Sequence, residues 1–357
     1  MNNNKFIGLA ALALAMALPF SRLVAAMEFA DPLDTPAMHS NLAVKGPLTG
    51  MANAGERLVV VGQRGHILYS DDTGQHWQQA KVPVSSDLVA VHFPSAHQGW
   101  AVGHDGVVLH SSDAGASWSR QFDGRQIGPL MLQYYQTLAA AEPRNPVIAD
   151  LVIEAQRMTE EGADKPFLDV WFQSEQVGYV VGAFNLIFRT NDGGRSWTPW
   201  MDRTENPSAF NLYGLRGVGN DLFIVGEQGL VLKLDAASGR FKAVATPYNG
   251  SYFGVIGKPG VTLVYGLRGN LYRSLDSGAS WSRVDTGLSV SITGATVDLA
   301  GRIILLGQAG HVLVSTDDGA SFVSRPQDRL APISAALATH DSLVLVGPRG
   351  VRILPIE

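Results

Sequence analysis

The sequence predicts an all-β fold, a seven-bladed β-propeller, from three observations: a long-period repeat, a glycine-rich composition and a recurring turn motif. The chain has 357 residues, 39 of them Gly, and no Cys. The segment 59–77 recurs along the chain, and a period of about 40 residues with strand-like alternation is typical of four-stranded blades. Seven copies therefore predict seven blades. Their anchor glycines are Gly62, Gly103, Gly182, Gly226, Gly266, Gly307 and Gly347.

The second repeat shows how one blade divides into strands, which are named A to D outward from the axis. We expect these strands at 88–93, 99–102, 107–111 and 117–121. The seventh repeat supplies strands A, B and C before the chain ends. We therefore expect the segment 28–38 to add the outer strand of blade 7, because this would cover an exposed sheet edge. Residues 27–357 then form a single domain.

The first 26 residues have the three-part pattern of a secretory signal peptide. Lys5 precedes an apolar run from Ile7 to Phe20, and small residues follow at Val24–Ala26. The run is shorter than the roughly 20 residues that a membrane-spanning helix needs, which argues against an uncleaved anchor. We expect a cleaved, exported, periplasmic protein that does not itself insert into a membrane. A lipid anchor on Cys is excluded because the chain has none.

Composition and charge exclude several classes of function. The chain has 27 Lys+Arg against 32 Asp+Glu, a formal net charge of −5, and no basic block of the kind that nucleic-acid binding needs. The nine His residues form no pair with metal-ligand spacing, and no Cys is present to bind zinc or a cluster. We therefore expect no nucleic-acid partner, no metal and no cofactor, and we assign no catalytic residue.

The recurring turn motif is Ser/Thr-x-Asp-x-Gly-x-x-Trp/Phe, known as the Asp-box. We expect the Asp carboxylate to accept backbone N–H groups within the turn, the Gly to take a positive φ and the aromatic ring to pack between strands. The motif therefore indicates the fold, and its carboxylates are structural rather than catalytic. The Asp-box residues are Asp72, Asp113, Asp192, Asp276 and Asp317, with Trp77, Trp118, Trp197 and Trp281 and, in the sixth repeat, Phe322.

The longer repeat, V-G-x-x-G-x-[ILV]-x-x-[ST]-x-D-x-G-x-[ST]-W, resembles the photosystem II stability/assembly factor family, a branch of the BNR/Asp-box propellers. The resemblance covers residues 58–357. It implies a non-enzymatic scaffold or assembly factor for a membrane-associated complex. It also implies a partner such as a photosystem-like complex or an RND-type (MMPL-like) transporter, because similar exported propellers occur beside such transporters. We expect a monomer.

The turns between strands B and C carry the candidate binding residues. Six of the seven turns read Gly-x-x-Gly, and blade 3 has Asn185 in place of the second Gly. Three of the seven place Arg at the third position, namely Arg64, Arg268 and Arg349. Blades 7 and 1 are neighbours in a closed ring, so Arg349 and Arg64 should lie close together. Such a cluster could bind a carboxylate, a phosphate or an acidic protein loop. The alternative is that these are ordinary solvated turn residues. Arg216, near strand A of blade 4, is a weaker candidate.

An insertion between blades 2 and 3, at about 126–165, predicts two helices on the same face as the B–C turns. Apolar residues recur in it at helical spacing. Asn145-Pro146 is typical of a helix start and Gly162 of a helix end. The insertion is either a lid packed on the propeller or a docking element for a partner.

Two alternative functions come from the same repeats. A sialidase-like glycoside hydrolase also uses Asp-boxes, but the Arg-Ile-Pro segment typical of sialidases is missing. Its chemistry also needs paired carboxylates, whereas Asp105 and Glu227 belong to different blades. The second alternative is a propeller that binds a small anion in its axial channel.

Overall fold

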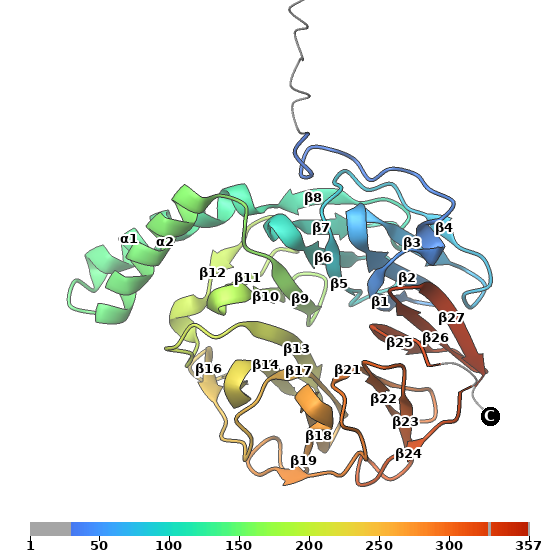
Figure 1. The fold of residues 1–357 in the computed structure, drawn as a ribbon. Helices are drawn as coiled ribbons and strands as arrows, with labels where there is room; N and C mark the ends of the chain where they lie inside the picture. Colours follow the sequence, from blue (N-terminus) through green and yellow to red (C-terminus); the bar gives the residue numbers. More distant parts are fainter. Residues whose placement is uncertain (1–29, 328–329, 356–357) are drawn as a thin grey trace, which may run out of the picture. The chain divides into compact units, whose positions relative to one another are not determined.

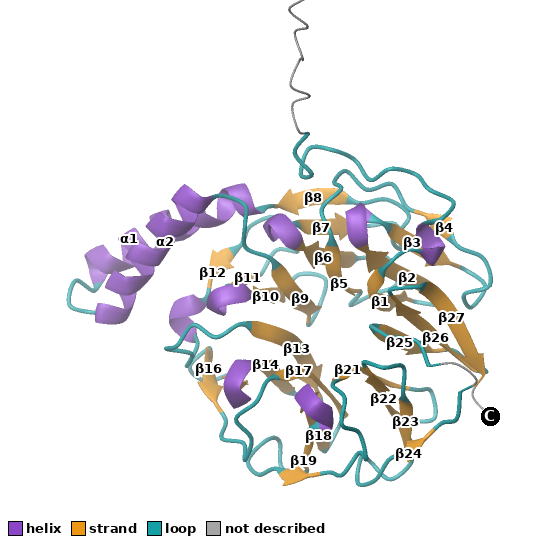
Figure 2. Ribbon diagram, viewed as in Figure 1, coloured by secondary structure: helices purple, strands orange, loops and turns teal. Residues whose placement is uncertain are grey.

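Seven antiparallel sheets surround a common axis in the computed structural model of the chain, which describes residues 30–327 and 330–355 (Figures 1 and 2). In these residues, six sheets have four strands and the last has three. Blade 1 contains β1 Leu48–Ala54, β2 Arg57–Gly62, β3 Ile67–Ser70 and β4 Gln78–Gln79, and blade 2 contains β5 Leu88–His92, β6 Gly99–Gly103, β7 Val108–Ser111 and β8 Ser119–Phe122. Blade 3 contains β9 Phe167–Phe172, β10 Gly178–Gly182, β11 Ile187–Thr190 and β12 Thr198–Pro199. Blade 4 contains β13 Leu212–Val218, β14 Asp221–Gly226, β15 Val231–Asp235 and β16 Arg240–Ala243. Blades 5 to 7 contain β17 Tyr252–Lys258, β18 Val261–Gly266, β19 Leu271–Ser274, β20 Ser282–Arg283; β21 Ile292–Val297, β22 Ile303–Gly307, β23 Val312–Ser315, β24 Val323–Ser324; and β25 Ala335–Ala338, β26 Ser342–Gly347, β27 Gly350–Pro355.

The innermost strands close a ring. Each of β1, β5, β9, β13, β17, β21 and β25 contacts the innermost strand of both neighbouring blades, and β25 contacts β1. The predicted seven-bladed propeller is therefore confirmed. The four strands predicted for blade 2 match β5 to β8 to within two residues at each end.

The second strand of each blade forms the core. Every residue of β6, β10, β18 and β22 is buried, because these strands are covered on both faces by adjacent blades. Their sequences are accordingly continuous apolar runs rather than alternating ones, as in Ile303–Gly307. Each fully buried Val, Leu or Ile side chain contributes about 1.5–3 kcal/mol. This repeated apolar strand is what holds neighbouring blades together.

The Asp-box turns have the hydrogen bonds that the sequence predicts. In blade 1, Asp72 Oδ1 accepts from the His76 backbone N–H at 2.9 Å and from Ser70 Oγ at 2.8 Å, and the Gly74 N–H donates to Ser70 Oγ at 2.9 Å. Gly74 has a φ of +92° and lies against Val344 of blade 7, so a side chain there would be crowded. Each turn therefore seals its blade against the preceding one.

The insertion forms the two predicted helices, α1 Gly124–Ala141 and α2 Pro146–Glu161, which pack side by side (Figure 1). Asn145 Oδ1 accepts from the Val147 N–H at 3.1 Å, and Gly162 ends α2 with a φ of +75°, as predicted. The start of α1 lies earlier than expected because Asp123 and Gln126 form a reciprocal capping box.

The predicted closure of blade 7 by a strand at 28–38 is wrong for the residues that the structure describes. Within them β27 is the last strand of its sheet, and residues 30–38 contain no strand. The segment instead crosses the outside of blade 1, where the Ala37 N–H donates to the Val82 carbonyl at 3.1 Å and the Ser85 N–H to the Pro32 carbonyl at 2.8 Å. We call residues 31–38 the N-terminal strap. Residues 28 and 29 lie outside the described part.

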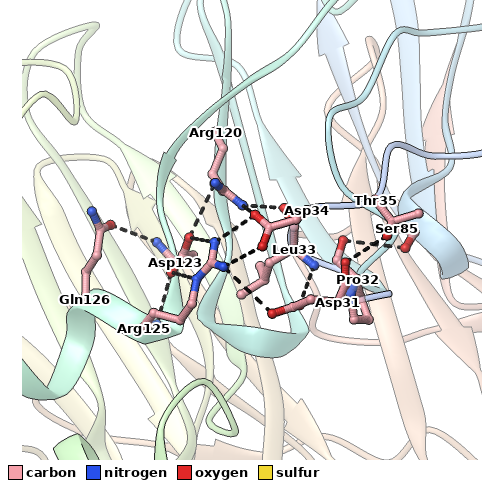
Figure 3. Close-up of polar contacts among 10 residues, drawn as sticks. All are labelled: Asp31, Pro32, Leu33, Asp34, Thr35, Ser85, Arg120, Asp123, Arg125 and Gln126. Carbon is pink, nitrogen blue, oxygen red and sulfur yellow. Dashed lines mark hydrogen bonds and ion pairs between the residues drawn. The ribbon is translucent and has the colours of Figure 1, made fainter. Parts of the chain in front are cut away.

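The chemistry of the strap explains this path. Pro32 and Pro36 lack the N–H donors that a continuous sheet edge requires. Leu33 is 2% exposed and belongs to an apolar cluster that includes Val82 and Trp118. Figure 3 shows the polar side of the strap, where Asp34 faces Arg120 of β8 and Arg125 at the start of α1. Besides its backbone hydrogen bonds, the strap is held by the apolar packing of Leu33 and by a set of ion pairs, namely Asp34–Arg120, Asp34–Arg125 and Asp31–Arg125.

The predicted signal peptide, residues 1–26, lies outside the described residues. In the part of the chain that the structure describes, no helix has the length and apolar character needed to cross a membrane.

Candidate binding face

The B–C turns define one face of the ring, which we call the B–C face. Five of them form short 3-10 turns, η2 Gln63–Gly65, η3 His104–Gly106, η4 Ala183–Asn185, η6 Glu227–Gly229 and η7 Leu267–Gly269. In each, the third residue of the Gly-x-x-Gly motif has a left-handed backbone, with φ between 50° and 57°. Arg64 and Arg268 therefore occupy positions where residues other than Gly, Asn and Asp are strained, by about 1 kcal/mol. Both residues are exposed to solvent.

The structure adds a residue that sequence reasoning missed, Lys45. The short turn η1 Ala43–Lys45 lies against the B–C turn of blade 7, where the Cα of Lys45 is close to Gly350. Two residues later, the Pro47 carbonyl accepts a hydrogen bond from the Gln63 N–H of blade 1. Lys45 therefore lies between the turns that carry Arg349 and Arg64. Lys45 could not be predicted as a binding residue, because the sequence gives no indication that residues 40–47 bridge these two blades.

We call Lys45, Arg64 and Arg349 the basic row. All three residues are exposed. Among the ion pairs of the described residues, none involves these three side chains, so their charges face solvent. The structure thus brings Arg64 and Arg349 to adjacent blades, as predicted. Arg268 shares the B–C face but lies in blade 5, with the blade 6 turn Gly307–Gly310 between it and blade 7.

Arg216 does not belong to this face, so the structure separates it from the other three predicted arginines. It lies on β13 opposite Phe223, near the A–B end of the blade, and lines an axial cavity of about 280 Å³. Its Nη1 is 2.7 Å from Asp169 Oδ2 on β9. Asp169 also accepts the N–H groups of Val170 and Leu215, at 2.9 and 2.8 Å. Arg216 is therefore engaged in joining blades 3 and 4.

The helices lie beside the B–C face, as the topology predicts. Gly106 in η3 is packed against Gly124 and Ile127 at the start of α1. Tyr135 of α1 is fully buried, and its hydroxyl accepts from the Met201 N–H at 3.1 Å. Burial raises the pKa of the Tyr135 phenol well above its usual value. The hairpin is thus anchored to blades 2 and 3 by apolar packing.

A groove of about 780 Å³ separates α2 from the turns of blade 3. One wall is the first part of α2, including Val147 and Leu151. The other wall comes from η4 and from η5 Met201–Arg203 with the loop that follows it. Its lining includes apolar side chains from both walls, and it opens on the B–C face beside Phe184. Sequence reasoning located the insertion but not this groove.

The Asp-box carboxylates are occupied by turn hydrogen bonds on the opposite face. Hydrogen bonds from Ser280 and Ser274 lower the pKa of Asp276 to about 2, and those from Ser321 and Ser315 do the same for Asp317. Such carboxylates stay ionised and already have partners for their oxygens. On the B–C face, Glu227 accepts from the Asn211 N–H at 2.8 Å and lies 3.2 Å from the Tyr213 hydroxyl. These contacts give the carboxylates structural roles.

The sequence model of the family described as "Photosynthesis system II assembly factor YCF48" matches residues 51–128 and 152–286. The unmatched interval between them, 129–151, contains most of α1 and the first turns of α2. The family match therefore covers blades 1 to 5 and passes over the hairpin.

The curated relatives are photosystem II assembly factors. The chain is 26% identical over 142 residues to the photosystem II assembly lipoprotein Ycf48 of Synechococcus sp. (strain CC9902), covering 39% of this chain and 32% of the relative. It is 21% identical over 246 residues to the chloroplastic photosystem II stability/assembly factor HCF136 of Arabidopsis thaliana, covering 49% of this chain and 60% of the relative. The chain thus spans between a third and three fifths of the length of these relatives.

Solved structures support the fold. A structure of YCF48 bound to a D1 peptide superposes with a TM-score of 0.64 at 17% identity, covering 90% of this chain and 99% of that chain. YCF48 from Cyanidioschyzon merolae gives a TM-score of 0.61 at 14% identity, covering 89% and 97%. The WD40 β-propeller domain of Doa1 gives 0.62 at 10% identity, covering 91% and 97%.

Proposed function

The chain belongs to the family of the photosystem II assembly factor YCF48, and on that premise we propose that it is a non-enzymatic assembly factor. In this proposal it binds an exported, acidic segment of a membrane protein on the B–C face. The basic row of Lys45, Arg64 and Arg349 supplies the main contacts, and Arg268 contributes from blade 5.

The observation that carries the proposal is the basic row itself. Three cations lie on the turns and bridging segment of two adjacent blades, in a chain whose net charge is −5. Arg side chains bind carboxylates through paired N–H donors, and a local positive cluster on an acidic protein attracts an acidic segment selectively. The relative solved with a D1 peptide supports a peptide segment as the class of ligand.

The conformation of Arg64 supports the same assignment. Arg64 has a φ of 57°, where Asn or Gly would relieve backbone strain. The turn itself needs no guanidinium, because it is held through the Arg64 N–H, which donates to Asp87 Oδ1 at 2.7 Å. A residue that the turn disfavours and does not use is a candidate for binding.

The testing experiment is photo-crosslinking in cells of the source organism, with the full chain and a crosslinking residue at Gln63 on the B–C face. A crosslinking residue at Thr73, on the opposite Asp-box face, is the control. We expect a membrane-protein adduct, identified by mass spectrometry, from Gln63 and not from Thr73. The adduct should be lost in the triple variant Lys45→Gln/Arg64→Asn/Arg349→Gln.

A matched control removes three positive charges elsewhere. Arg195→Gln/Arg283→Gln/Lys81→Gln changes the net charge equally at exposed positions away from the basic row. It should leave the Gln63 adduct unchanged. Because Asn suits the left-handed backbone at position 64, loss of the adduct in the test variant would not come from unfolding. An undiminished adduct in that variant would refute the site.

Two finer alternatives from the sequence analysis receive less support. The names of the relatives favour a photosystem-type complex over an RND-type transporter. A glycoside hydrolase would need a free pair of carboxylates, whereas the Asp-box carboxylates and Glu227 are engaged in hydrogen bonds. Export to the periplasm is part of the proposal, and it rests on the signal-peptide pattern of residues 1–26.

A further inference from the structure

The groove between α2 and blade 3 differs from the basic row in both chemistry and position. Its apolar lining includes Val147 and Leu151 of α2, Phe184 of η4 and Met201 of η5. Val147 is 56% exposed and Phe184 48% exposed, so each wall of the groove presents an exposed apolar side chain. Exposed apolar surface of this kind, bordered by polar residues, marks interaction sites.

Phe184 carries an additional signal. It occupies the third position of its Gly-x-x-Gly-type turn with a φ of 54°, where the other left-handed turns have Arg, Asp or Gln. A bulky aromatic residue in this conformation is a backbone outlier, and such outliers cluster at ligand-binding sites. The turn holds the residue through its backbone, because the Phe184 N–H donates to Asn211 Oδ1 at 2.7 Å. The ring is half-exposed, and Lys165 Nζ lies over it at 5.6 Å from its centroid. Lys165 itself pairs with Glu161 and Asp164.

The charge around the groove is acidic. Four carboxylates border it, against the two guanidinium groups of Arg157 and Arg240. Both guanidinium groups are engaged, since Arg157 pairs with Glu154 and Glu161 and Arg240 donates to the Asp202 carbonyl at 2.7 Å. Among the ion pairs of the described residues, none involves Asp150 or Glu205, and both are exposed. Glu205 Oε2 also accepts the Ala243 N–H at 2.9 Å, so its second oxygen is the one left for a ligand. The unbalanced charge at the groove is therefore negative. The four carboxylates are Asp150, Glu154, Asp202 and Glu205.

We propose that this groove docks an extended segment of the partner protein in which apolar side chains alternate with Lys or Arg. The apolar side chains would pack on Phe184 and Leu151, and the cations would face Asp150 and Glu205. This inference rests on the proposed function, because it names a second contact of the same partner. The B–C face would then have two binding sites of opposite charge, the acidic groove at blade 3 and the basic row at blades 7 and 1.

Part of the α2 wall of the groove lies outside the residues that the family model matches. Val147, Asp150 and Leu151 all fall in the unmatched interval 129–151. The groove residues of blades 3 and 4 lie within the matched part. An inserted hairpin that adds one wall to a shared surface would change which partner segment binds there.

The test uses two fluorescein-labelled hexapeptide probes, one of alternating Leu and Lys and one of alternating Leu and Glu. Binding to the purified full chain is measured by fluorescence anisotropy at low ionic strength. We expect saturable binding of the Leu/Lys probe and none of the Leu/Glu probe. In the variant Asp150→Lys/Glu205→Lys, the Kd of the Leu/Lys probe should rise about tenfold or more, since two attractive contacts become repulsive.

The matched control is Glu56→Lys/Asp341→Lys, which makes the same change in net charge at exposed positions on A–B turns. It should bind the Leu/Lys probe like the original chain. A second variant, Val147→Ser/Phe184→Asn, removes apolar surface without altering charge and should also weaken binding. Equal weakening by the control variant, or no change with either groove variant, would overturn the proposal.

The two proposals fail in different ways. The basic-row variant Lys45→Gln/Arg64→Asn/Arg349→Gln should still bind the Leu/Lys probe, because its substitutions lie outside the groove. If that variant keeps the membrane-protein adduct while the probe binds as expected, the proposed function is wrong and the groove stands. If the adduct behaves as expected and the probe does not bind, the groove proposal is overturned. A dimer that Asp150→Lys/Glu205→Lys dissociates would also overturn it, because the occupant would then be a second copy.

Discussion

The carboxylate of Asp169 on β9 lies 2.7 Å from the guanidinium of Arg216 on β13, across the boundary between blades 3 and 4. Asp169 is nearly buried, with 8% of its side chain exposed, whereas 37% of the Arg216 side chain faces the axial cavity. Two backbone N–H groups also donate to Asp169, from Val170 and Leu215. The acid therefore organises this contact, and the arginine is one of its three donors.

This difference between the two residues predicts that replacing Asp169 lowers the free energy of unfolding more than replacing Arg216. Asp169→Ala leaves two backbone donors and a guanidinium without their acceptor. It should lower the free energy of unfolding by about 2–3 kcal/mol, less than for a fully buried pair because Arg216 is partly solvated. Arg216→Met leaves Asp169 with both backbone donors and should cost about 1 kcal/mol or less. Urea denaturation of both variants checks this, and a larger cost for Arg216→Met would contradict it.

The sequence predicted the ring because each blade's folding is local. The period, the Asp-box turns and the caps at Asn145 and Gly162 depend on residues a few positions apart, and all were confirmed. The path of the N-terminal strap depends instead on Leu33 finding an apolar cluster and on Asp34 finding Arg120 and Arg125, more than 80 positions away. No pattern near residue 33 contains that information.

The candidate site likewise contains some residues that the sequence predicts and others that only the structure places. Arg64, Arg268 and Arg349 were identified because they occupy one repeat position, and the topology places that position on one face. Lys45 has no repeat partner, so its place between two blades came from the structure alone. The sequence also suggests Arg216 as a weaker member of this group, but the residue lies on β13 and lines the axial cavity, where it pairs with Asp169.

The imidazole of His92 predicts a pH dependence of stability. Burial lowers the pKa of His92 to about 3, with a smaller contribution from the nearby charge of Arg216, and Nδ1 accepts from the Phe172 N–H at 3.1 Å. The unfolded chain has a His pKa near 6.5, so between pH 6.5 and 3 the unfolded chain binds a proton at this residue and the folded chain does not. Stability from this group is complete above pH 6.5 and is lost as pH falls toward 3.

The slope of this effect is measurable by difference. Between these pH values His92 should contribute up to about 1.4 kcal/mol per pH unit to the free energy of unfolding. Comparing His92→Gln with the original chain by urea denaturation at several pH values isolates the contribution, because the Asp and Glu residues are common to both. Parallel pH profiles for the two chains would show that His92 titrates alike in both states.

The hydroxyl of Ser70 predicts the cost of breaking one Asp-box turn. Ser70 is 1% exposed, and its Oγ donates to Asp72 and accepts the buried Gly74 N–H at 2.9 Å. Ser70→Ala removes that acceptor and should cost about 1–3 kcal/mol of unfolding free energy. Ser70→Thr should cost much less, because Thr190 makes the same bond to the Gly194 N–H in blade 3 at 2.8 Å. Equal destabilisation by Ala and Thr would point to packing rather than to the hydrogen bond.

Two residues of the N-terminal strap allow the contribution of apolar packing to stability to be measured separately from that of surface ion pairs. Leu33 is 2% exposed in its cluster, so Leu33→Ala should lower the free energy of unfolding by about 2–5 kcal/mol. Asp34 has a side chain that is 56% exposed, so Asp34→Ala should change stability much less even though it removes contacts with two arginines. Urea denaturation gives both values.

Limited proteolysis provides the second readout for the strap. If Leu33 is the anchor, Leu33→Ala should release residues 31–38 and expose them to cleavage, while Asp34→Ala should remain protected. The propeller itself should stay intact in both variants, because β1 and β25 close the ring without the strap. Cleavage of Asp34→Ala at the rate of Leu33→Ala would show instead that the ion pairs with Arg120 and Arg125 hold the segment in place.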